Sequence, residues 1–284
     1  MHTLDNIRIR DPFILPVPAE HRYYLYGTTD ASPWHGRGES FLAWSSLDLE
    51  NWEGPFTVFT PPDDFWADQN FWAPEVYMYQ DAYIMIASFK HDNKCRGVQI
   101  LSGDSPLGPF RPLTNAPITP DNWDCLDGTL YIEHGVPWLI FSHEWTQIVN
   151  GEICAVPLTS NLTACAGKIR TLFRATDAPW TAQNTGDVHE GKNGWVTDGP
   201  FLYRDRDEQL CMLWSSFTST SYAIGTAVSD NGMITGSWQQ NPSPVFEKDG
   251  GHGMLFQTFE GGTYLAMHRP NHTPDERVYL IEWD

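Results

Sequence analysis

Short apolar segments alternate along the chain with clusters of Gly, Pro, Asn and Asp. The segments are rich in Tyr, Phe, Trp, Ile and Val, and this composition between turn residues is typical of β-strands. No window shows the sustained hydrophobic period of a long amphipathic helix. The pattern of hydrophobic and polar positions therefore predicts an all-β chain.

One apolar segment recurs five times and aligns as the second strand of a repeated unit. Its copies cover residues 23–28, 83–88, 137–142, 210–215 and 263–268, and most of them end near a small hydroxyl residue. A third strand follows in register at residues 41–45, 97–101, 152–156 and 222–227. Units of about 50 to 70 residues with four short strands each are typical of β-propeller blades.

We therefore expect a five-bladed β-propeller, a single domain of four-stranded antiparallel blades around a central axis. The expected blades cover approximately residues 8–62, 70–115, 124–175, 194–247 and 249–284. A β-sandwich or jelly roll is the alternative, but five aligned units weigh against it. The last unit shows only three strands, so either that blade is short or residues 2–9 close the ring and remove an open strand edge.

An acidic residue stands just before the first strand of four units. These residues are Asp11, Glu75, Asp127 and Asp198, and the fifth unit carries His252 between two glycines. A single Asp before a strand is a common turn former, but equivalent positions of a propeller meet around its axis. Asp11, Asp127 and Asp198 are therefore predicted to form a site, whereas Glu75 also fits a structural corner.

The second strand of an antiparallel blade returns to the face at which the first strand starts. Residues near this face are therefore candidates for substrate binding: Trp72, Glu75, His143, Glu144, Trp145, Phe217 and Arg269. The aromatic ones, together with Trp34, suit either stacking on sugar rings or ordinary packing between blades. Arg269 suits hydrogen bonding to sugar hydroxyls or neutralisation of the acidic ring.

Carboxylates that converge on a solvent-filled axis are what glycoside hydrolysis requires. Different surroundings can give these carboxyls different pKa values and roles. One stays ionised to activate water, one stays protonated to donate to the leaving oxygen, and one orients the other two and tunes their pKa values. Placement on different blades favours the separation of about 6.5 to 9.5 Å that an inverting mechanism needs to admit a water molecule.

The charge balance narrows the class of partner. The chain has 17 Lys plus Arg against 36 Asp plus Glu, a formal net charge of −19, which argues against nucleic acid and anionic membrane surfaces. A neutral carbohydrate fits better, and the 13 Trp, 11 Tyr and 15 Phe suit sugar stacking as well as a large core. The oligomeric state has no indication in the sequence.

The sequence shows no clear targeting segment and no cysteine motif. No stretch approaches the roughly 20 apolar residues of a membrane span, and the N-terminus lacks the basic and apolar regions of a signal peptide. The five cysteines are odd in number and show no CxxC pair, which favours reduced thiols over a disulfide framework or a zinc site. The chain as given is expected in the cytoplasm, and a secreted mature form stays open.

Five motifs follow one another in a specific order. They are Arg-Asp-Pro at 10–12, Phe-Trp-Ala-Pro-Glu at 71–75, Leu-Asp-Gly-Thr-Leu at 126–130, Asp-Gly-Pro-Phe-Leu at 198–202 and Gly-His-Gly at 251–253. In order and spacing they resemble glycoside hydrolase family 43, and the resemblance covers essentially the whole chain. It implies a five-bladed propeller and inversion at furanosides or xylosides, with α-L-arabinofuranosidase, arabinanase and β-xylosidase as common activities.

The resemblance also implies roles for single residues. Asp11 matches the general base, and Asp127 matches the residue that tunes and orients the acid. Asp198 stands where the family usually has a Glu general acid, and its side chain is shorter by about 1.5 Å, one C–C bond. Either Asp198 is still the acid, which the intact rest of its motif favours, or Glu144 or Glu190 supplies the proton, or the site is impaired.

No cofactor is required by this chemistry. His252 resembles the histidine that helps to hold a hydrated calcium ion at the propeller centre in many family members. Calcium prefers oxygen ligands, so waters would complete its shell. Such an ion would be structural or electrostatic, and a histidine hydrogen-bonded in the core is the alternative.

The sequence thus predicts an inverting, exo-acting α-L-arabinofuranosidase. The exo mode follows from loops around residues 32–40, 90–96 and 175–194, which look able to wall the pocket. A β-D-galactofuranosidase or β-xylosidase is the alternative within the class. A non-catalytic sugar-binding propeller is an alternative of a different class, and the departure at Asp198 is the best argument for it. A third alternative, a glycoside phosphorylase, would need a cationic cluster for phosphate, and only Arg10, Arg269 and the histidines are available for it.

Overall fold

The strands form five separate antiparallel sheets that follow one another in chain order. This computed structural model describes residues 1–185 and 191–283. Blade 1 contains β1 (Arg10–Val17), β2 (Arg22–Thr28), β3 (Phe41–Ser46) and β4 (Trp52–Phe59). Blade 2 contains β5 (Gln69–Tyr79), β6 (Ala82–His91), β7 (Lys94–Gly103) and β8 (Arg111–Pro112). Blade 3 contains β9 (Cys125–Glu133), β10 (Val136–His143), β11 (Glu152–Pro157) and β12 (Arg170–Arg174). Blade 4 contains β13 (Asp198–Arg204), β14 (Leu210–Phe217), β15 (Tyr222–Ser229) and β16 (Trp238–Gln240). Blade 5 contains β17 (Gly251–Gln257), β18 (Thr263–Arg269) and β19 (Arg277–Glu282).

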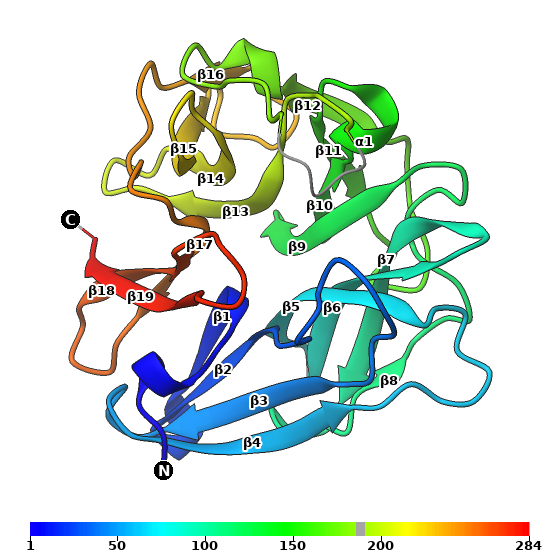
Figure 1. The fold of residues 1–284 in the computed structure, drawn as a ribbon, viewed down its shortest axis with the longest axis vertical. Coiled ribbons are helices and arrows are strands. Elements are labelled where there is room, and N and C mark those ends of the chain that lie inside the picture. The colour runs from blue at the N-terminus through cyan, green and yellow to red at the C-terminus, as the bar shows by residue number, and fades with distance from the viewer. Residues whose placement is uncertain (186–190, 284) are drawn as a thin grey trace.

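The blades are arranged as a ring. The first strands β1, β5, β9, β13 and β17 surround the centre, and the later strands of each blade follow outward (Figure 1). Neighbouring first strands contact one another all around the ring, including β17 against β1. The prediction of an all-β, five-bladed propeller is confirmed, and the alternative of a β-sandwich is wrong because each sheet packs between two neighbours.

The hydrophobic core lies between blades. Separate apolar clusters join blades 5, 1 and 2, blades 2 and 3, blades 3 and 4, and blades 4 and 5. Inner strands are consequently apolar on both faces: in β14 every residue from Leu210 to Ser216 is buried. This double burial explains why the second strands read as continuous apolar runs rather than as an alternating pattern.

The N-terminal segment meets both ends of the ring. Arg8 forms an isolated antiparallel bridge with Arg277 of β19, and the guanidinium of Arg8 lies 3.1 Å from the carboxylate of Glu276. His2 instead forms a bridge with Trp52 of β4. Blade 5 therefore remains three-stranded, and the expected closure by residues 2–9 is limited there to the neighbourhood of Arg8.

Helices are a minor part of the described residues. They are η1 (Leu4–Asn6), η2 (Pro18–Glu20), α1 (Trp145–Ile148) and η3 (Ala175–Asp177). None of the described helices has the length and apolar character needed to cross a membrane. The five cysteines are all free thiols, three of them buried.

Candidate active site

Each first strand is interrupted by a β-bulge, in which two residues oppose one on the second strand. The bulges at equivalent positions are Asp11-Pro12, Ala73-Pro74, Asp127-Gly128, Gly199-Pro200 and His252-Gly253, and β5 has a second bulge at Asn70-Phe71. The first residue of every bulge has a left-handed backbone, with φ between 46° and 54°. A bulge at the inner strand reorients side chains, and here the reoriented positions surround the propeller axis.

The bulges correct the equivalence of the acidic residues. Asp11 and Asp127 occupy the same bulge position, which His252 takes in blade 5, whereas Asp198 directly precedes the bulge of β13. Glu75 follows the bulge of β5. The expectation of one shared acidic position in four blades is therefore wrong, because Asp198 and Glu75 flank their bulges and do not occupy the left-handed bulge position.

The backbone N–H groups of the bulge residues link the blades. Three of them donate to hydroxyls at or near the end of the second strand of the preceding blade: Ala73 to Thr28 Oγ1 (2.8 Å), Asp127 to Ser88 Oγ (2.9 Å) and His252 to Ser215 Oγ (2.8 Å). At the ring closure Asp11 donates to His268 Nδ1 (3.2 Å). In blade 4 Gly199 donates to Asp127 Oδ2 instead (2.9 Å).

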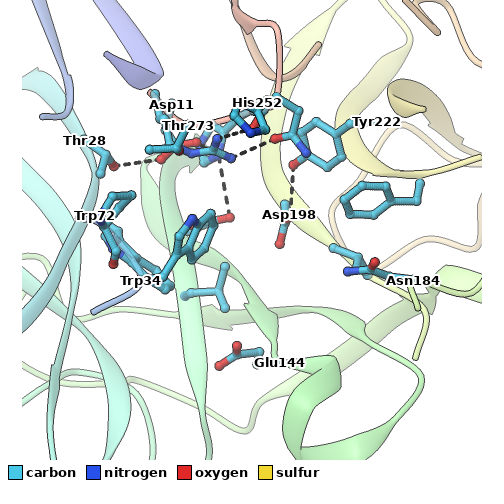
Figure 2. A pocket seen from close by; sticks show the side chains of 18 of the residues that line it. Asp11, Thr28, Trp34, Trp72, Glu144, Asn184, Asp198, Tyr222, His252 and Thr273 are labelled. Atoms are coloured by element: carbon cyan, nitrogen blue, oxygen red, sulfur yellow. Dashed lines mark hydrogen bonds and ion pairs between the residues drawn. The ribbon is translucent and has the colours of Figure 1, made fainter. Parts of the chain in front are cut away.

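A pocket of about 530 Å³ opens at these bulges (Figure 2). Of the residues predicted from the sequence, it is lined by Asp11, Trp34, Trp72, Asp127, Glu144, Trp145, Asp198, Phe217 and His252. The structure therefore brings together the three aspartates and most of the predicted aromatic side chains.

Three predicted residues lie outside the pocket lining. Glu75 is buried beneath it and accepts a hydrogen bond from the hydroxyl of Tyr77. The ring of His143 stacks on Trp123 with a centroid distance of 4.2 Å. The guanidinium of Arg269 donates to the carbonyl of Lys248 (2.8 Å). A fourth candidate, Glu190, lies outside the described residues.

Several lining residues were missed as members of the site. They include Thr28, Asn184, Tyr222, Asn271, His272 and Thr273. Tyr222 opens β15, and a third strand starts at the same face where the second strand ends. The start of the third strand could therefore have identified Tyr222, whereas residues 271–273 belong to a loop without a pattern of its own.

The surroundings of Asp11 favour the ionised form. Thr28 Oγ1 donates to its Oδ2 (2.7 Å), and His252 Nδ1 lies 3.2 Å from its Oδ1. Burial acts to raise the pKa of Asp11, but the charge and hydrogen bond of His252 outweigh it and hold the pKa well below its usual range. Asp11 is therefore a carboxylate at any working pH.

Asp198 has the opposite electrostatic setting. Burial and the nearby charge of Asp127 raise its pKa to about 8, although a hydrogen bond from Tyr222 partly offsets them. Burial also raises the pKa of Asp127, against the charge of His252 and the N–H of Gly199. One pocket thus holds an ionised carboxylate and a carboxyl that keeps its proton near neutral pH.

His252 supplies a buried positive charge between the carboxylates. Its Nδ1 lies 3.2 Å from Asp11 and 3.7 Å from Asp127. Burial acts to lower the pKa of His252, but these two carboxylates raise it to about 10. Gly199 packs against the imidazole so closely that a Cβ would lie 2.8 Å from its Cγ, and its φ of 52° also favours glycine.

The calcium expected at His252 stays a prediction. Within residues 1–185 and 191–283, no group of three or more His, Cys, Asp or Glu side chains is arranged to hold a metal ion. The Nδ1 of His252 faces two carboxylates and not an open coordination position. Because these residues do not fit a direct metal site, we derive no step through calcium.

A propeller whose axial pocket holds one ionised and one protonated carboxyl is typical of a glycoside hydrolase. Comparison with known proteins agrees with this class. The family model of glycosyl hydrolases family 43 matches residues 5–282, so the chain belongs to glycoside hydrolase family 43. Comparison with curated protein sequences finds no match.

Solved structures show the same fold. An endo-arabinase from Bacteroides thetaiotaomicron VPI-5482 is 40% identical, with 99% of this chain and 96% of that chain covered and a TM-score of 0.92. A thermostable family-43 glycoside hydrolase is 22% identical over 96% and 89% of the two chains, with a TM-score of 0.79. An α-L-arabinofuranosidase from Lactobacillus brevis is 16% identical over 97% and 90%, with a TM-score of 0.76.

Proposed function

We propose that this glycoside hydrolase removes terminal α-L-arabinofuranosyl residues with inversion of the anomeric configuration. The observation that carries the proposal is the contrast between Asp11 and Asp198, two carboxyls of one pocket with opposite shifts of their pKa values. An inverting reaction needs this pair, because one group must accept a proton while the other donates one.

Each aspartate has one task in the proposed mechanism. Asp11 takes a proton from the water that attacks the anomeric carbon. Asp198 gives its proton to the glycosidic oxygen, so that the leaving sugar departs as an alcohol. Asp127 lies beside both, raises the pKa of Asp198 by its charge and accepts the N–H of Gly199. Its role is to keep the acid protonated and its strand in place.

The pocket offers an aromatic wall for the sugar. Trp34 and Trp72 meet edge to face, with ring centroids 5.3 Å apart. The carbonyl of Pro33 accepts hydrogen bonds from Trp72 Nε1 (2.8 Å) and Asn70 Nδ2 (3.0 Å), which hold the loop of blade 1 against blade 2. Rings fixed in this way suit stacking on a furanose.

The pocket also contains an ion-paired glutamate. Glu144 contacts the guanidinium of Arg96, which lies 4.1 Å from the ring centroid of Trp72. This ion pair engages one carboxylate oxygen of Glu144 and leaves the other for a sugar hydroxyl. Glu144 therefore suits substrate binding better than proton donation.

There are two candidate modes of substrate cleavage, exo action at chain ends and internal cleavage. Exo action is supported by the wall that Ser32, Pro33 and Trp34 form on one side of the pocket, with Asn184 on another. Residues 90–96, the third expected wall, contribute no lining residue. Internal cleavage of arabinan is the second candidate, because the structure that is 40% identical is described as an endo-arabinase.

A panel of 4-nitrophenyl furanosides and xylosides, assayed with and without phosphate, tests the activity. Fastest turnover of the α-L-arabinofuranoside without phosphate supports the proposal, and β-D-galactofuranoside or β-D-xyloside preference contradicts the sugar. Phosphate dependence would indicate a phosphorylase, and sugar binding without turnover a lectin. Proton NMR of the first product reports inversion, and chain lengths released from linear arabinan separate removal of single residues from internal cleavage.

A further inference from the structure

Tyr222 has no role in the chemistry described so far, yet its ring is held firmly at the site. The side chain is 3% exposed and stacks near His268, with ring centroids 5.7 Å apart. The ring of Phe217 packs against the ring of Tyr222 at a centroid distance of 5.0 Å. A Cβ on Gly251 would lie only 1.9 Å from Cε1 of Tyr222, so the absence of a side chain at Gly251 makes room for the ring.

The hydroxyl of Tyr222 points at the acid. It donates to Oδ2 of Asp198 over 2.9 Å (Figure 2). The two residues belong to β15 and β13, the strands on either side of β14 in blade 4. Burial and the charge of Asp198 raise the pKa of Tyr222 well above its usual value, so the hydroxyl keeps its proton at working pH. It acts as a permanent donor to one oxygen of the carboxyl.

A fixed donor at Oδ2 has two consequences for Asp198. It holds the plane of the carboxyl, which otherwise rotates about a soft terminal torsion. It also occupies Oδ2 as an acceptor, so that Oδ1 is the oxygen left to carry the transferable proton.

We propose that Tyr222 is a positioning residue for proton donation, which turns Asp198 so that Oδ1 delivers its proton to the leaving oxygen. The inference rests on the proposed function, in which Asp198 is the general acid. Tyr222 contacts the acid and not the substrate. Replacing it should therefore slow the reaction most for leaving groups that depend on protonation by Asp198.

Two substrates with one sugar and different leaving groups test this dependence. 4-Nitrophenolate departs with little protonation, whereas the alcohol of an arabino-oligosaccharide needs the acid. Tyr222→Phe is expected to lower kcat about 10-fold or more on the oligosaccharide and less than about 3-fold on the 4-nitrophenyl arabinofuranoside. Equal losses on both substrates would overturn the proposal.

The chain offers a matched control. The hydroxyl of Tyr264 donates to Glu282 over 3.2 Å on an exposed part of blade 5, so Tyr264→Phe removes the same type of contact away from the pocket. Tyr264→Phe is expected to leave both substrates unaffected. Gly251→Ala displaces the ring of Tyr222 while keeping its hydroxyl, and the same selective loss on the oligosaccharide is expected.

A double variant separates this proposal from the proposed function. Because Tyr222 acts through Asp198, Asp198→Asn with Tyr222→Phe should be no slower on the oligosaccharide than Asp198→Asn alone. An additional loss contradicts the proposal. If the wild type prefers another glycoside, the assigned sugar is wrong, and the same comparison on that glycoside and its aryl analogue still tests Tyr222.

A titration adds a measurement that needs no turnover. The groups that face Asp198 are Asp127, Tyr222, His252 and Asp11. Among them Tyr222 lowers the pKa of Asp198 by donating to its ionised form. Carbon NMR of labelled aspartate carboxyls should therefore show that the pKa of Asp198 is higher in Tyr222→Phe than in the wild type. An unchanged pKa would contradict the hydrogen bond from Tyr222 to Asp198.

Discussion

At the scale of single residues, the chemistry depends on how two chemically identical side chains are surrounded. Asp11 accepts from Thr28 and faces His252, whereas Asp198 is buried beside Asp127. The sequence could suggest that both belong to one site. Their separate roles can be assigned only from their tertiary contacts, because the pKa of a carboxyl depends on burial and on charges within a few ångströms.

Asp11→Asn is expected to reduce kcat by about 100-fold to 10,000-fold on every substrate, because the amide cannot accept a proton from water. Steady-state kinetics on aryl and oligosaccharide substrates checks this. Asp207→Asn, at the exposed turn after β13, is the control and should be unchanged. Near-normal turnover in Asp11→Asn would contradict the assignment of the base.

The activity should fall as the pH rises through the pKa of Asp198, which lies at about 8. The acid is active only with its proton, so ionisation above this pH removes it, whereas Asp11 with its lowered pKa stays ionised throughout. A profile of kcat/KM against pH should therefore hold from pH 6 to 7 and decline above about pH 8. Constant activity to pH 10 would contradict Asp198 as the acid.

The same raised pKa predicts a cost in stability. Between the ordinary value of 3.8 and about 8, the folded state binds more protons at Asp198 than the unfolded state, so the free energy of unfolding falls as pH rises. Asn does not titrate. The wild type should therefore lose stability relative to Asp198→Asn as the pH rises, so that the Tm of the variant minus the Tm of the wild type increases from pH 4 to pH 8. A Tm difference that is constant with pH would contradict the raised pKa of Asp198.

At the scale of elements, the β-bulges of the first strands decide where the site residues lie. In each blade the first residue of the equivalent bulge has a left-handed backbone, and its N–H is held by a side chain of another strand. Strand runs and hydroxyl residues at the ends of second strands are visible in the sequence. The bulge register is not, because it results from pairing between strands that apolar runs leave undetermined.

Ser215→Ala should lower the free energy of unfolding by about 1 to 3 kcal/mol, because it leaves the buried N–H of His252 without an acceptor. Ser142 is the equivalent residue of blade 3, but its buried Oγ has no hydrogen-bond partner among the residues that the structure describes. Ser142→Ala should therefore cost less than about 0.5 kcal/mol. Denaturant unfolding of both variants measures the difference, and equal losses would contradict the role of the bulge contacts.

At the scale of the whole molecule, the ring must close between its last and first blades. Asp11 and His268 contact each other across this junction, and the N-terminal segment contributes Arg8 beside β19. His268 accepts the N–H of Asp11, and its pKa is lowered to about 3 by burial and by Arg10. Closure of the ring therefore also orients the proposed base.

Arg8→Ala should destabilise the protein by about 3 to 5 kcal/mol, because it removes the cation beside the fully buried carboxylate of Glu276. Arg22→Ala removes a comparable contact with Glu53, whose side chain is 56% exposed. That control should lose less than about 1 kcal/mol. Unfolding curves that show equal losses would indicate that Arg8 has no special part in closure.

The sequence by itself determined the five-unit all-β fold, the family resemblance and the convergence of Asp11, Asp127 and Asp198. These follow from the repeated apolar runs and from short motifs, both of which are local in the chain. Only the tertiary structure decided that Asp198 and Glu75 are not equivalent to Asp11, that Glu144 is paired with Arg96, and that Tyr222 holds Asp198. The physical reason is that bulge register, burial and charge arise from contacts between residues distant in sequence.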